Sequence, residues 1–377
     1  METQSVEASR SPATLSSDDV YSVIRPDGTT DPERDPKLPL EQVLDLYRHM
    51  VRTRSLDIQL ERLQRQGRIG FHIGSLGEEA TVVGSVAAFA EQDWVFPCYR
   101  EFGAILWRGL PLQTYVNNMY GNADDVVSGR QMPDHYTGRP YHYGSVSSPI
   151  GTQITQAVGF AWAGLLKKEK FAVGVYFGDG ATSSNEFHTG LNFAGVFKTP
   201  TVFLCRNNRW AISVPSERQT ASENFAIKGV AYGVPGVRCD GNDLLAAYAV
   251  TRRAVEAARA GGGSTLIEFL TYRLGGHSTS DDPRAYRAQD EVEAWRKTDP
   301  IVRLRAYLEH RDAWDDDREE SLKDQVEKEL RACIDHAEKV APPALASMFE
   351  DVFEEVPWHL EEQREALLQG PRAKGHH

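Results

Sequence analysis

Two short apolar runs, residues 171–177 and 201–206, stand on either side of a segment with helical periodicity, residues 186–197. Short apolar runs bounded by polar clusters are typical of buried strands. Further along, "VPGVRCDG" and "STLIEFLTYRL" are also predicted to be strands, with the helical segment "DLLAAYAVTRRAVEAARAG" between them. Alternating strands and helices favour a parallel sheet with helices on both faces. The sequence therefore predicts an α/β fold of this kind.

Composition and periodicity divide the chain into three parts. Residues 1–36 are rich in Ser, Asp, Pro and Thr, which predicts a mobile N-terminal arm. The α/β domain is expected over residues 37–340, and a helical C-terminal tail over residues 341–377. Near this boundary the predicted helices are 319–340 and, after two prolines, about 343–367.

Two other segments carry predictions of their own. The segment "GTQITQAVGFAWAGLLKK" has helical periodicity with hardly any polar face, so we expect a buried helix there. Residues 121–148 form a loop that is too long for a simple connection, which favours a functional role for it.

The charge and the cysteines exclude several classes of protein. Asp and Glu outnumber Lys and Arg by 54 to 42, and no dense basic run occurs, so nucleic-acid binding is not expected. No apolar run approaches the length of a membrane span. The four cysteines contain no CxxC pair, which predicts neither a zinc site nor a disulfide framework. Because the first residues also lack an apolar signal core, a cytoplasmic location is expected.

Polar clusters follow the first two predicted strands, at the point where each one ends. Gly178-Asp179-Gly180 comes after the first strand and Asn207-Asn208 after the second. Ligands bind at the carboxyl ends of parallel strands in such folds, so both clusters are expected to face one crevice if the strands are neighbours. Ser183 and Glu186 have the spacing of a capping box, which predicts that a helix begins there and offers free N–H groups to a phosphate.

The residue types in this crevice favour a metal-bound diphosphate. A carboxylate, an amide oxygen and backbone carbonyls are the hard oxygen ligands of Mg²⁺, which fills its remaining positions with phosphate oxygens and water. A GDG sequence or an Asn-Asn pair by itself is more often an ordinary turn or strand end. Found together on consecutive strands around one capped helix, they predict the metal site. Neither a P-loop nor a GxGxxG motif occurs.

GDG followed about thirty residues later by NN is similar to the motif of thiamin diphosphate enzymes. Most of the chain, roughly residues 40 to 365, resembles the α subunit of the E1 component of 2-oxo acid dehydrogenase complexes. The resemblance lies in "FPCYREFGAILWRG", "SVSSPIGTQITQAVG", "CRNNRWAIS" and "YRLGGHSTSDDPRAYR". Within this family, "RQMPDHY", "HSTSDD" and "FEDVFEEVPWHLEEQ" are more similar to the branched-chain enzymes than to pyruvate dehydrogenase. The fold implied is the thiamin diphosphate-binding fold.

The resemblance also implies which residues bind the cofactor. Asp179, the Asn208 side chain and the Trp210 carbonyl would hold Mg²⁺. The diphosphate would be bound by the backbone N–H groups of Gly180 and Ala181 and by the side chains of Tyr99, Arg100 and Arg206. Ser148 and Ile150 would contact the aminopyrimidine. A potassium ion found in some members would be bound by Ser147, Pro149, Thr152 and Gln153. Without the family, Ile150 is interpreted as an ordinary core residue, and a surface ion pair is the alternative for Arg100 and Arg206.

Two further positions gain roles from the resemblance. His277 lies in a loop rich in glycine, hydroxyl and acidic residues that would otherwise be a solvated turn. In the family this histidine helps to position the cofactor and the incoming lipoyl group, and an imidazole can move protons near neutral pH. Ser278 matches a residue phosphorylated in some relatives, but the place of a second such serine is taken by Ala288, so that regulation is not predicted. Phe71, otherwise a core residue, is assigned to the wall of the acyl pocket.

The resemblance implies the activity and the partners. A 2-oxo acid would be decarboxylated and its acyl group transferred to the lipoyl group of an E2 acyltransferase. The glutamate that activates the cofactor belongs to a β subunit in this family, so the chain is expected to act in an α2β2 heterotetramer. The alternatives are a pyruvate or acetoin dehydrogenase α subunit, or a non-catalytic cofactor-binding subunit.

Overall fold

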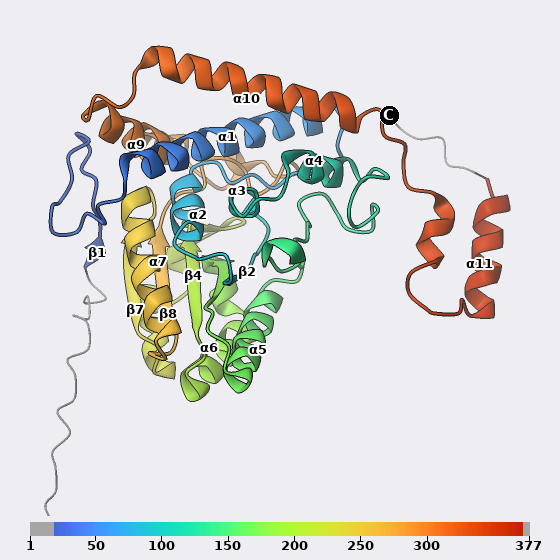
Figure 1. Ribbon diagram of the computed structural model, residues 1–377, viewed down its shortest axis with the longest axis horizontal. Helices are drawn as coiled ribbons and strands as arrows, with labels where there is room; N and C mark the ends of the chain where they lie inside the picture. The colour runs from blue at the N-terminus through green and yellow to red at the C-terminus, as the bar shows by residue number, and fades with distance from the viewer. Residues whose placement is uncertain (1–18, 372–377) are drawn as a thin grey trace, which may run out of the picture.

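The computed structural model describes residues 19–371, and its centre is a six-stranded sheet (Figure 1). All neighbouring strands of this sheet are parallel, in the order β1-β7-β8-β4-β3-β2. The strands are β1 (Val20–Tyr21), β2 (Trp94–Phe96), β3 (Val173–Gly178), β4 (Thr201–Asn207), β7 (Gly236–Asp240) and β8 (Thr265–Leu270), and a separate antiparallel hairpin is formed by β5 (Trp210–Ala211) and β6 (Val214–Pro215).

Helices cover both faces of the sheet, as the sequence predicts. Helices α2 and α7 pack on one face, and α5 and α6 on the other. The helices are α1 (Leu40–Arg65), α2 (Glu79–Val86), α3 (Phe102–Trp107), α4 (Leu112–Tyr120), α5 (Thr152–Lys167), α6 (Asn185–Phe197), α7 (Leu244–Arg259), α8 (Gln289–Arg296), α9 (Pro300–Glu309), α10 (Asp316–Ala337) and α11 (Trp358–Gln369). Short 3₁₀ helices are η1 (Arg139–Tyr141), η2 (Asp179–Ser183), η3 (Ser216–Arg218), η4 (Ala226–Tyr232), η5 (Pro283–Ala285) and η6 (Leu345–Phe349).

The alternation of side chains along the central strands divides the core in two. Val202 and Leu204 of β4 pack into the larger cluster, on the side of α2 and α7. Phe203 and Cys205, the alternate residues of the same strand, pack into a second cluster with α5 and α6. Successive side chains of a strand point to opposite faces, so a strand that is buried on both faces must be apolar throughout. This is why the central strands appear in the sequence as continuous apolar runs.

The first described residues belong to the domain and not to the expected arm. Strand β1 pairs with β7, and the Asp243 carboxylate accepts hydrogen bonds from the backbone N–H groups of Val23 and Ile24, each at 2.6 Å. The prediction of an arm is therefore wrong for residues 19–36, because an edge strand this short leaves no periodic pattern in the sequence. Residues 1–18 lie outside the described residues.

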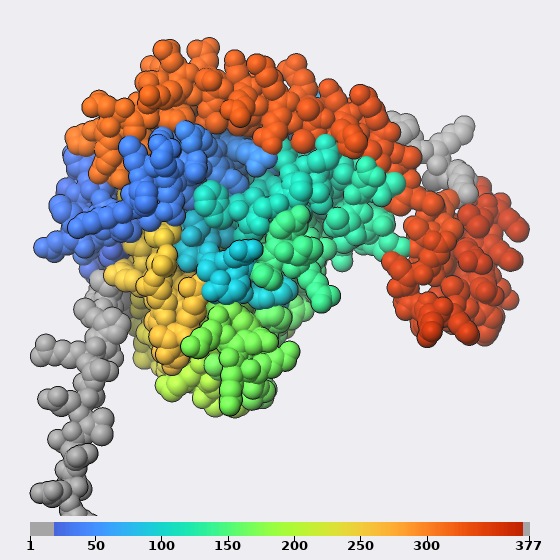
Figure 2. Space-filling model, in the orientation of Figure 1, coloured from blue at the N-terminus to red at the C-terminus, as the bar shows by residue number. Residues whose placement is uncertain are grey.

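The C-terminal part also differs from the prediction. The single helix expected over 343–367 is replaced by η6 and α11, with a non-helical stretch, residues 350–357, between them. Pro357 has no backbone N–H and cannot continue a helix, so α11 begins directly after it. Figure 2 shows this tail projecting at one side of the body, which it contacts through the ion pair of Asp351 with Arg130 at 3.2 Å, and the Trp358 side chain is 71% exposed. Residues 372–377 of the predicted tail lie outside the described part.

Helix α5 is only partly buried, contrary to expectation, because Leu166 on its outer face is 69% exposed.

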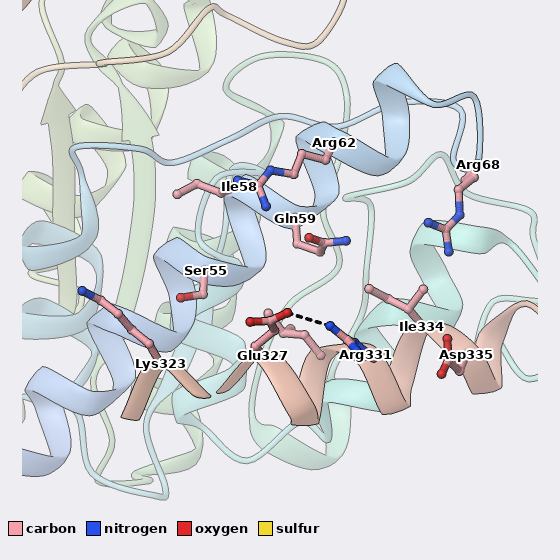
Figure 3. Close-up of a pocket in the computed structure, with 11 residues that line it drawn as sticks. Ser55, Ile58, Gln59, Arg62, Arg68, Lys323, Glu327, Arg331, Ile334 and Asp335 are labelled. Carbon is pink, nitrogen blue, oxygen red and sulfur yellow. Dashed lines mark hydrogen bonds and ion pairs between the residues drawn. The ribbon is translucent and has the colours of Figure 1, made fainter. Parts of the chain in front are cut away.

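A groove of about 530 Å³ runs between α1 and α10 and is lined mainly by charged and polar side chains from both helices (Figure 3). Within residues 19–371, no helix combines the length and the apolar character that crossing a membrane requires.

Candidate functional site

A cavity of about 400 Å³ lies at the carboxyl ends of β3 and β4, where the sequence predicts a ligand. The two strands are direct neighbours, which brings the GDG and Asn-Asn clusters together. Most of the predicted site residues line this cavity: Tyr99, Arg100, Ile150, Asp179, Gly180, Ala181, Arg206, Asn208, Trp210 and His277.

The turn after β3 is tighter than the capping-box pattern implies. Residues Asp179–Ser183 form the 3₁₀ helix η2, and α6 begins only after Ser184, whose Oγ accepts a hydrogen bond from the N–H of Phe187 at 3.3 Å. The helix cap is therefore Ser184 and not the predicted Ser183. Gly180 faces the β5 hairpin so closely that a Cβ there would lie 2.7 Å from the Cβ of Ala211. Only glycine permits this approach.

The predicted metal ligands meet at this turn with their oxygen atoms available. Nδ2 of Asn208 donates to Oε1 of Glu78 at 2.8 Å, which assigns the other amide atom as the oxygen; this oxygen accepts a hydrogen bond from the N–H of Trp210 at 3.3 Å and keeps a second lone pair for a metal. The carbonyl of Trp210, two residues further on, accepts a hydrogen bond from Nη1 of Arg273 at 3.2 Å and keeps a second lone pair. Among the described residues no group of three His, Cys, Asp or Glu side chains could hold a metal, so this mixed oxygen set is the candidate.

Asp179 provides the electrostatic reason to expect a cation. Its side chain is 1% exposed, and burial raises its pKa to about 6. Its carboxylate accepts a hydrogen bond from a neutral side chain: Nε2 of Gln219 donates to Oδ2 of Asp179 at 2.6 Å. No Lys or Arg within residues 19–371 forms an ion pair with it. A buried carboxylate without a basic partner is stabilised by a divalent cation, and the oxygen set suits Mg²⁺.

Arg206 reaches the cavity already paired with two carboxylates. Its Nη1 lies 2.5 Å from Glu78 and its Nε 2.6 Å from Glu101, and all three side chains are fully buried. Counting Asp179, three carboxylates in this region face one guanidinium of Arg206. Because Glu78 and Glu101 already pair with Arg206, its guanidinium leaves Asp179 without a basic partner of its own, and this arrangement can accommodate a metal cation at Asp179.

Arg100 holds His277 in the structure. Its Nη2 donates to the carbonyl of His277 at 2.8 Å and to Nδ1 of the same residue at 3.1 Å, while Nη1 donates to the carbonyl of Gly74. Burial and the charges of Arg100 and Arg273 lower the pKa of His277 to about 3. The imidazole is therefore neutral, with its proton on Nε2. It can donate a hydrogen bond, but the proton transfer near neutral pH suggested by the sequence requires Arg100 to move away.

The remaining predicted residues lie at the margin of the cavity or beyond it. Ile150 is 44% exposed at the cavity wall. Ser148 does not line the cavity, and its Oγ lies 2.6 Å from Nε2 of His135. Phe71 is half-buried in the loop before α2 and also lies outside the cavity lining. In the predicted potassium set, Gln153 donates to the carbonyl of Tyr176 at 2.9 Å.

Sequence reasoning missed Glu78, Gln219 and Arg273, which orient the predicted ligands. Glu78 stands in "LGEEA", a stretch that is indistinguishable from an acidic helix start until its partner Asn208, 130 residues away, is known. A buried acid is the only signal that could have pointed to it, and burial is not visible in a single sequence.

The chain is similar over most of its length to proteins of known name. A family model described as "Dehydrogenase E1 component" matches residues 47–345. The mitochondrial 2-oxoisovalerate dehydrogenase subunit alpha of Bos taurus is 42% identical over 368 residues, covering 97% of this chain and 81% of the relative. The Homo sapiens protein of the same name is 42% identical over 97% of this chain and 83% of its own length. Subunit alpha 1 of Arabidopsis thaliana is 41% identical over 92% of this chain and 74% of its own length.

Proposed function

This chain belongs to the dehydrogenase E1 component family, and we propose that it is the α subunit of a branched-chain 2-oxo acid dehydrogenase. The enzyme decarboxylates acids such as 2-oxoisovalerate and transfers the acyl group to the lipoyl group of an E2 acyltransferase. The observation that carries this proposal is the cavity at the ends of β3 and β4, which gathers Asp179, Asn208, Trp210 and His277. A cytoplasmic location is part of the proposal.

The family depends on thiamin diphosphate, and the cavity suits its diphosphate end. Asp179, Asn208 and the Trp210 carbonyl would hold Mg²⁺, and the backbone N–H groups of Gly180 and Ala181 would meet phosphate oxygens. When bound, the cofactor supplies the nucleophilic carbon and the electron sink for decarboxylation. A potassium ion beside Ser147, Pro149, Thr152 and Gln153 remains a proposal.

The chain itself contributes orientation and a hydrogen bond. Ile150 would offer the cofactor an apolar surface at the cavity wall and help to orient it. His277, held by Arg100 through Nδ1, presents Nε2–H as a neutral donor to an oxygen of the substrate or to the incoming lipoyl group. These groups hold reacting atoms in place, and the acid–base chemistry of cofactor activation falls to the β subunit.

The chain works with a β subunit and an E2 component, and we propose an α2β2 assembly. Ile150, the residue assigned to the aminopyrimidine, is 44% exposed, so a second chain is needed to enclose that end of the cofactor. Apolar side chains are exposed elsewhere as well, which is typical of subunit contacts. They include Leu166, Phe193, Val196, Phe197, Val352 and Trp358.

The substrate preference is expected to be for branched chains. An apolar pocket distinguishes one methylene group by ~1–3 kcal/mol, or roughly ten- to two-hundred-fold in kcat/KM. We keep Phe71 as a proposed part of the acyl wall, since the partner would supply the facing half. The assembled enzyme should therefore prefer 2-oxoisovalerate to pyruvate by about tenfold or more.

The test is the reaction of the purified chain, with and without its β subunit, on a panel of 2-oxo acids. We expect activity only in the mixture, with the highest kcat/KM for branched acids. A preference for pyruvate or for the acetoin reaction would assign the chain to those branches. Cofactor binding without activity on any acid would identify a non-catalytic subunit and overturn the proposal.

A further inference from the structure

A buried histidine outside the cavity lies between two carboxylates. Nε2 of His72 is 2.9 Å from Oδ1 of Asp57, and its Nδ1 is 3.1 Å from Oδ2 of Asp134. The His72 side chain is 1% exposed, and those of Asp57 and Asp134 are 6% and 0% exposed. When both carboxylates are ionised they can only accept hydrogen bonds, so both ring nitrogens carry protons and the ring is a cation.

Every oxygen of the two carboxylates has at least one hydrogen-bond donor. Asp134 accepts hydrogen bonds from the N–H of Ile73 at 2.7 Å and from the hydroxyl of Tyr115 at 2.6 Å. Asp57 accepts one from the N–H of Ser75 at 2.6 Å. This completeness matters, because a buried ion cluster is stable only when its charges are paired and hydrogen-bonded. The two opposite charges beside His72 outweigh the effect of burial and raise its pKa to about 10.

Three segments that are far apart in the sequence meet at His72. Asp57 belongs to α1, His72 to the loop before α2, and Asp134 to the long loop 121–148. The approach is close: a Cβ on Gly74 would lie 2.5 Å from Oδ1 of Asp57. The cluster therefore fixes the path of the loop before α2 and joins it to the long loop.

Each of these loops continues to a residue assigned to the candidate site. Two hydrogen bonds join the backbone of His72 to Thr279. The carbonyl of His72 accepts from the N–H of Thr279 at 3.0 Å, and the N–H of His72 donates to Oγ1 of Thr279 at 3.2 Å. Gly74, two residues after His72, accepts the hydrogen bond from Arg100, which in turn holds His277. On the other side, His135 next to Asp134 contacts Ser148.

We propose that His72, as a cation clamped between Asp57 and Asp134, is a positioning residue that holds the His277 loop and Ser148 in place at the candidate site. No residue of the loop around His277, from Gly275 to Asp282, belongs to an apolar core cluster. Its position therefore depends on polar contacts, and His72 and Arg100 supply several of them. The kinetic part of this inference rests on the proposed function, whereas the structural part does not.

The experiment compares amide hydrogen exchange in the assembled wild-type enzyme and in His72→Gln, read in residues 275–281 and 146–150. Glutamine is neutral and leaves Asp57 and Asp134 facing each other without a cation. We expect exchange at least tenfold faster in these two segments and little change in the central strands. We also expect kcat for transfer to the lipoyl acceptor to fall at least tenfold, while KM for the 2-oxo acid changes less than twofold.

Two further variants separate positioning from general destabilisation. Asp134→Asn keeps His72 paired with Asp57, so a milder form of the same local effect is expected if His72→Gln does not fold. Arg259→Gln is the matched control: it breaks a partly buried ion pair with Asp93, near the opposite, amino end of the sheet, and should destabilise the protein without changing exchange at 275–281.

The outcomes are distinct. Unchanged exchange at residues 275–281, or an increase there no larger than the increase in the central strands, would overturn the positioning role. If the wild type is inactive on every 2-oxo acid, the proposed function fails, and the exchange data still decide whether His72 holds the loops.

Discussion

Glu78 accepts a hydrogen bond from Nδ2 of Asn208 at 2.8 Å, and this contact determines which atom of the Asn208 amide faces the cavity. The other oxygen of Glu78 lies 2.5 Å from Nη1 of Arg206. One buried carboxylate thus orients a predicted metal ligand and neutralises the guanidinium beside it. Residues that orient metal ligands in this way affect metal affinity although they do not touch the ion.

Replacing Glu78 by glutamine should weaken Mg²⁺ binding. A glutamine can present its NH₂ group to Asn208, so that the Asn208 amide turns over. The substitution also removes the negative charge of Glu78 that neutralises Arg206. We expect Mg²⁺-dependent thiamin diphosphate affinity to fall ~10–100-fold, measured by titration calorimetry on the assembled enzyme. Glu79→Gln is the matched control, since Glu79 is equally buried but pairs with Arg54. Equal losses in the two variants would show that only stability had changed.

Asp179→Asn should separate cofactor binding from folding. Asparagine has nearly the same shape but no charge, so Mg²⁺-dependent binding of thiamin diphosphate should be lost. The melting temperature of the cofactor-free protein should stay the same or rise, because burial raises the pKa of Asp179 to about 6 and the ionised form is costly in this site. Calorimetry on both forms provides the two readings. Unchanged cofactor affinity would exclude Asp179 from the metal site.

His277 should not produce an inflection in the pH–rate profile near neutrality. Its pKa is lowered to about 3 by burial and by Arg100 and Arg273, so the imidazole stays neutral across the usual assay range. The profile of kcat for His277→Gln should be lower than that of the wild type but parallel to it from about pH 5.5 to 8. An inflection near pH 6.5 that disappears in the variant would mean that Arg100 leaves His277 during turnover.

The candidate site could be predicted where its residues follow a recognisable strand. Asp179 and Asn208 come directly after β3 and β4, and the carboxyl ends of parallel strands lie at one edge of the sheet. The apolar runs therefore predicted their proximity on the condition that the two strands are neighbours, and the structure shows that they are. The shift of the helix cap to Ser184 could not be predicted, because two adjacent serines offer the same side chain and the 3₁₀ turn between strand and helix leaves no pattern.

Interactions between distant segments were not visible in the sequence. Asp57 and Asp134 lie 15 and 62 residues from His72, and nothing near any of them indicates a shared charge cluster. The same holds for Arg206, which was assigned to the diphosphate but is paired with Glu78 and Glu101. Periodicity reports which residues are buried on an element, but it does not report which polar partner a buried charge will find.

The charge on His72 should make the stability of the protein depend on pH in the alkaline range. Its pKa is raised from 6.5 to about 10 in the folded protein, so its contribution is complete below pH 6.5 and is lost as the pH rises through about 10. The groups that face it are Asp57 of α1, Asp134 of the long loop and, through Asp134, Tyr115 of α4. Since every group common to both proteins cancels, the difference in melting temperature between wild type and His72→Gln should shrink steadily over this range.

His49→Gln provides the control for this measurement. His49 of α1 is buried, as His72 is, but burial lowers the pKa of His49 to about 4, so it is neutral throughout the same pH range. Its replacement should therefore lower the melting temperature by an amount that does not change from pH 6.5 upward. Scanning calorimetry of the three proteins at several pH values makes the comparison. If the His72→Gln difference is as constant as that of His49→Gln, then His72 is neutral in the folded protein, and the ion cluster with Asp57 and Asp134 does not exist.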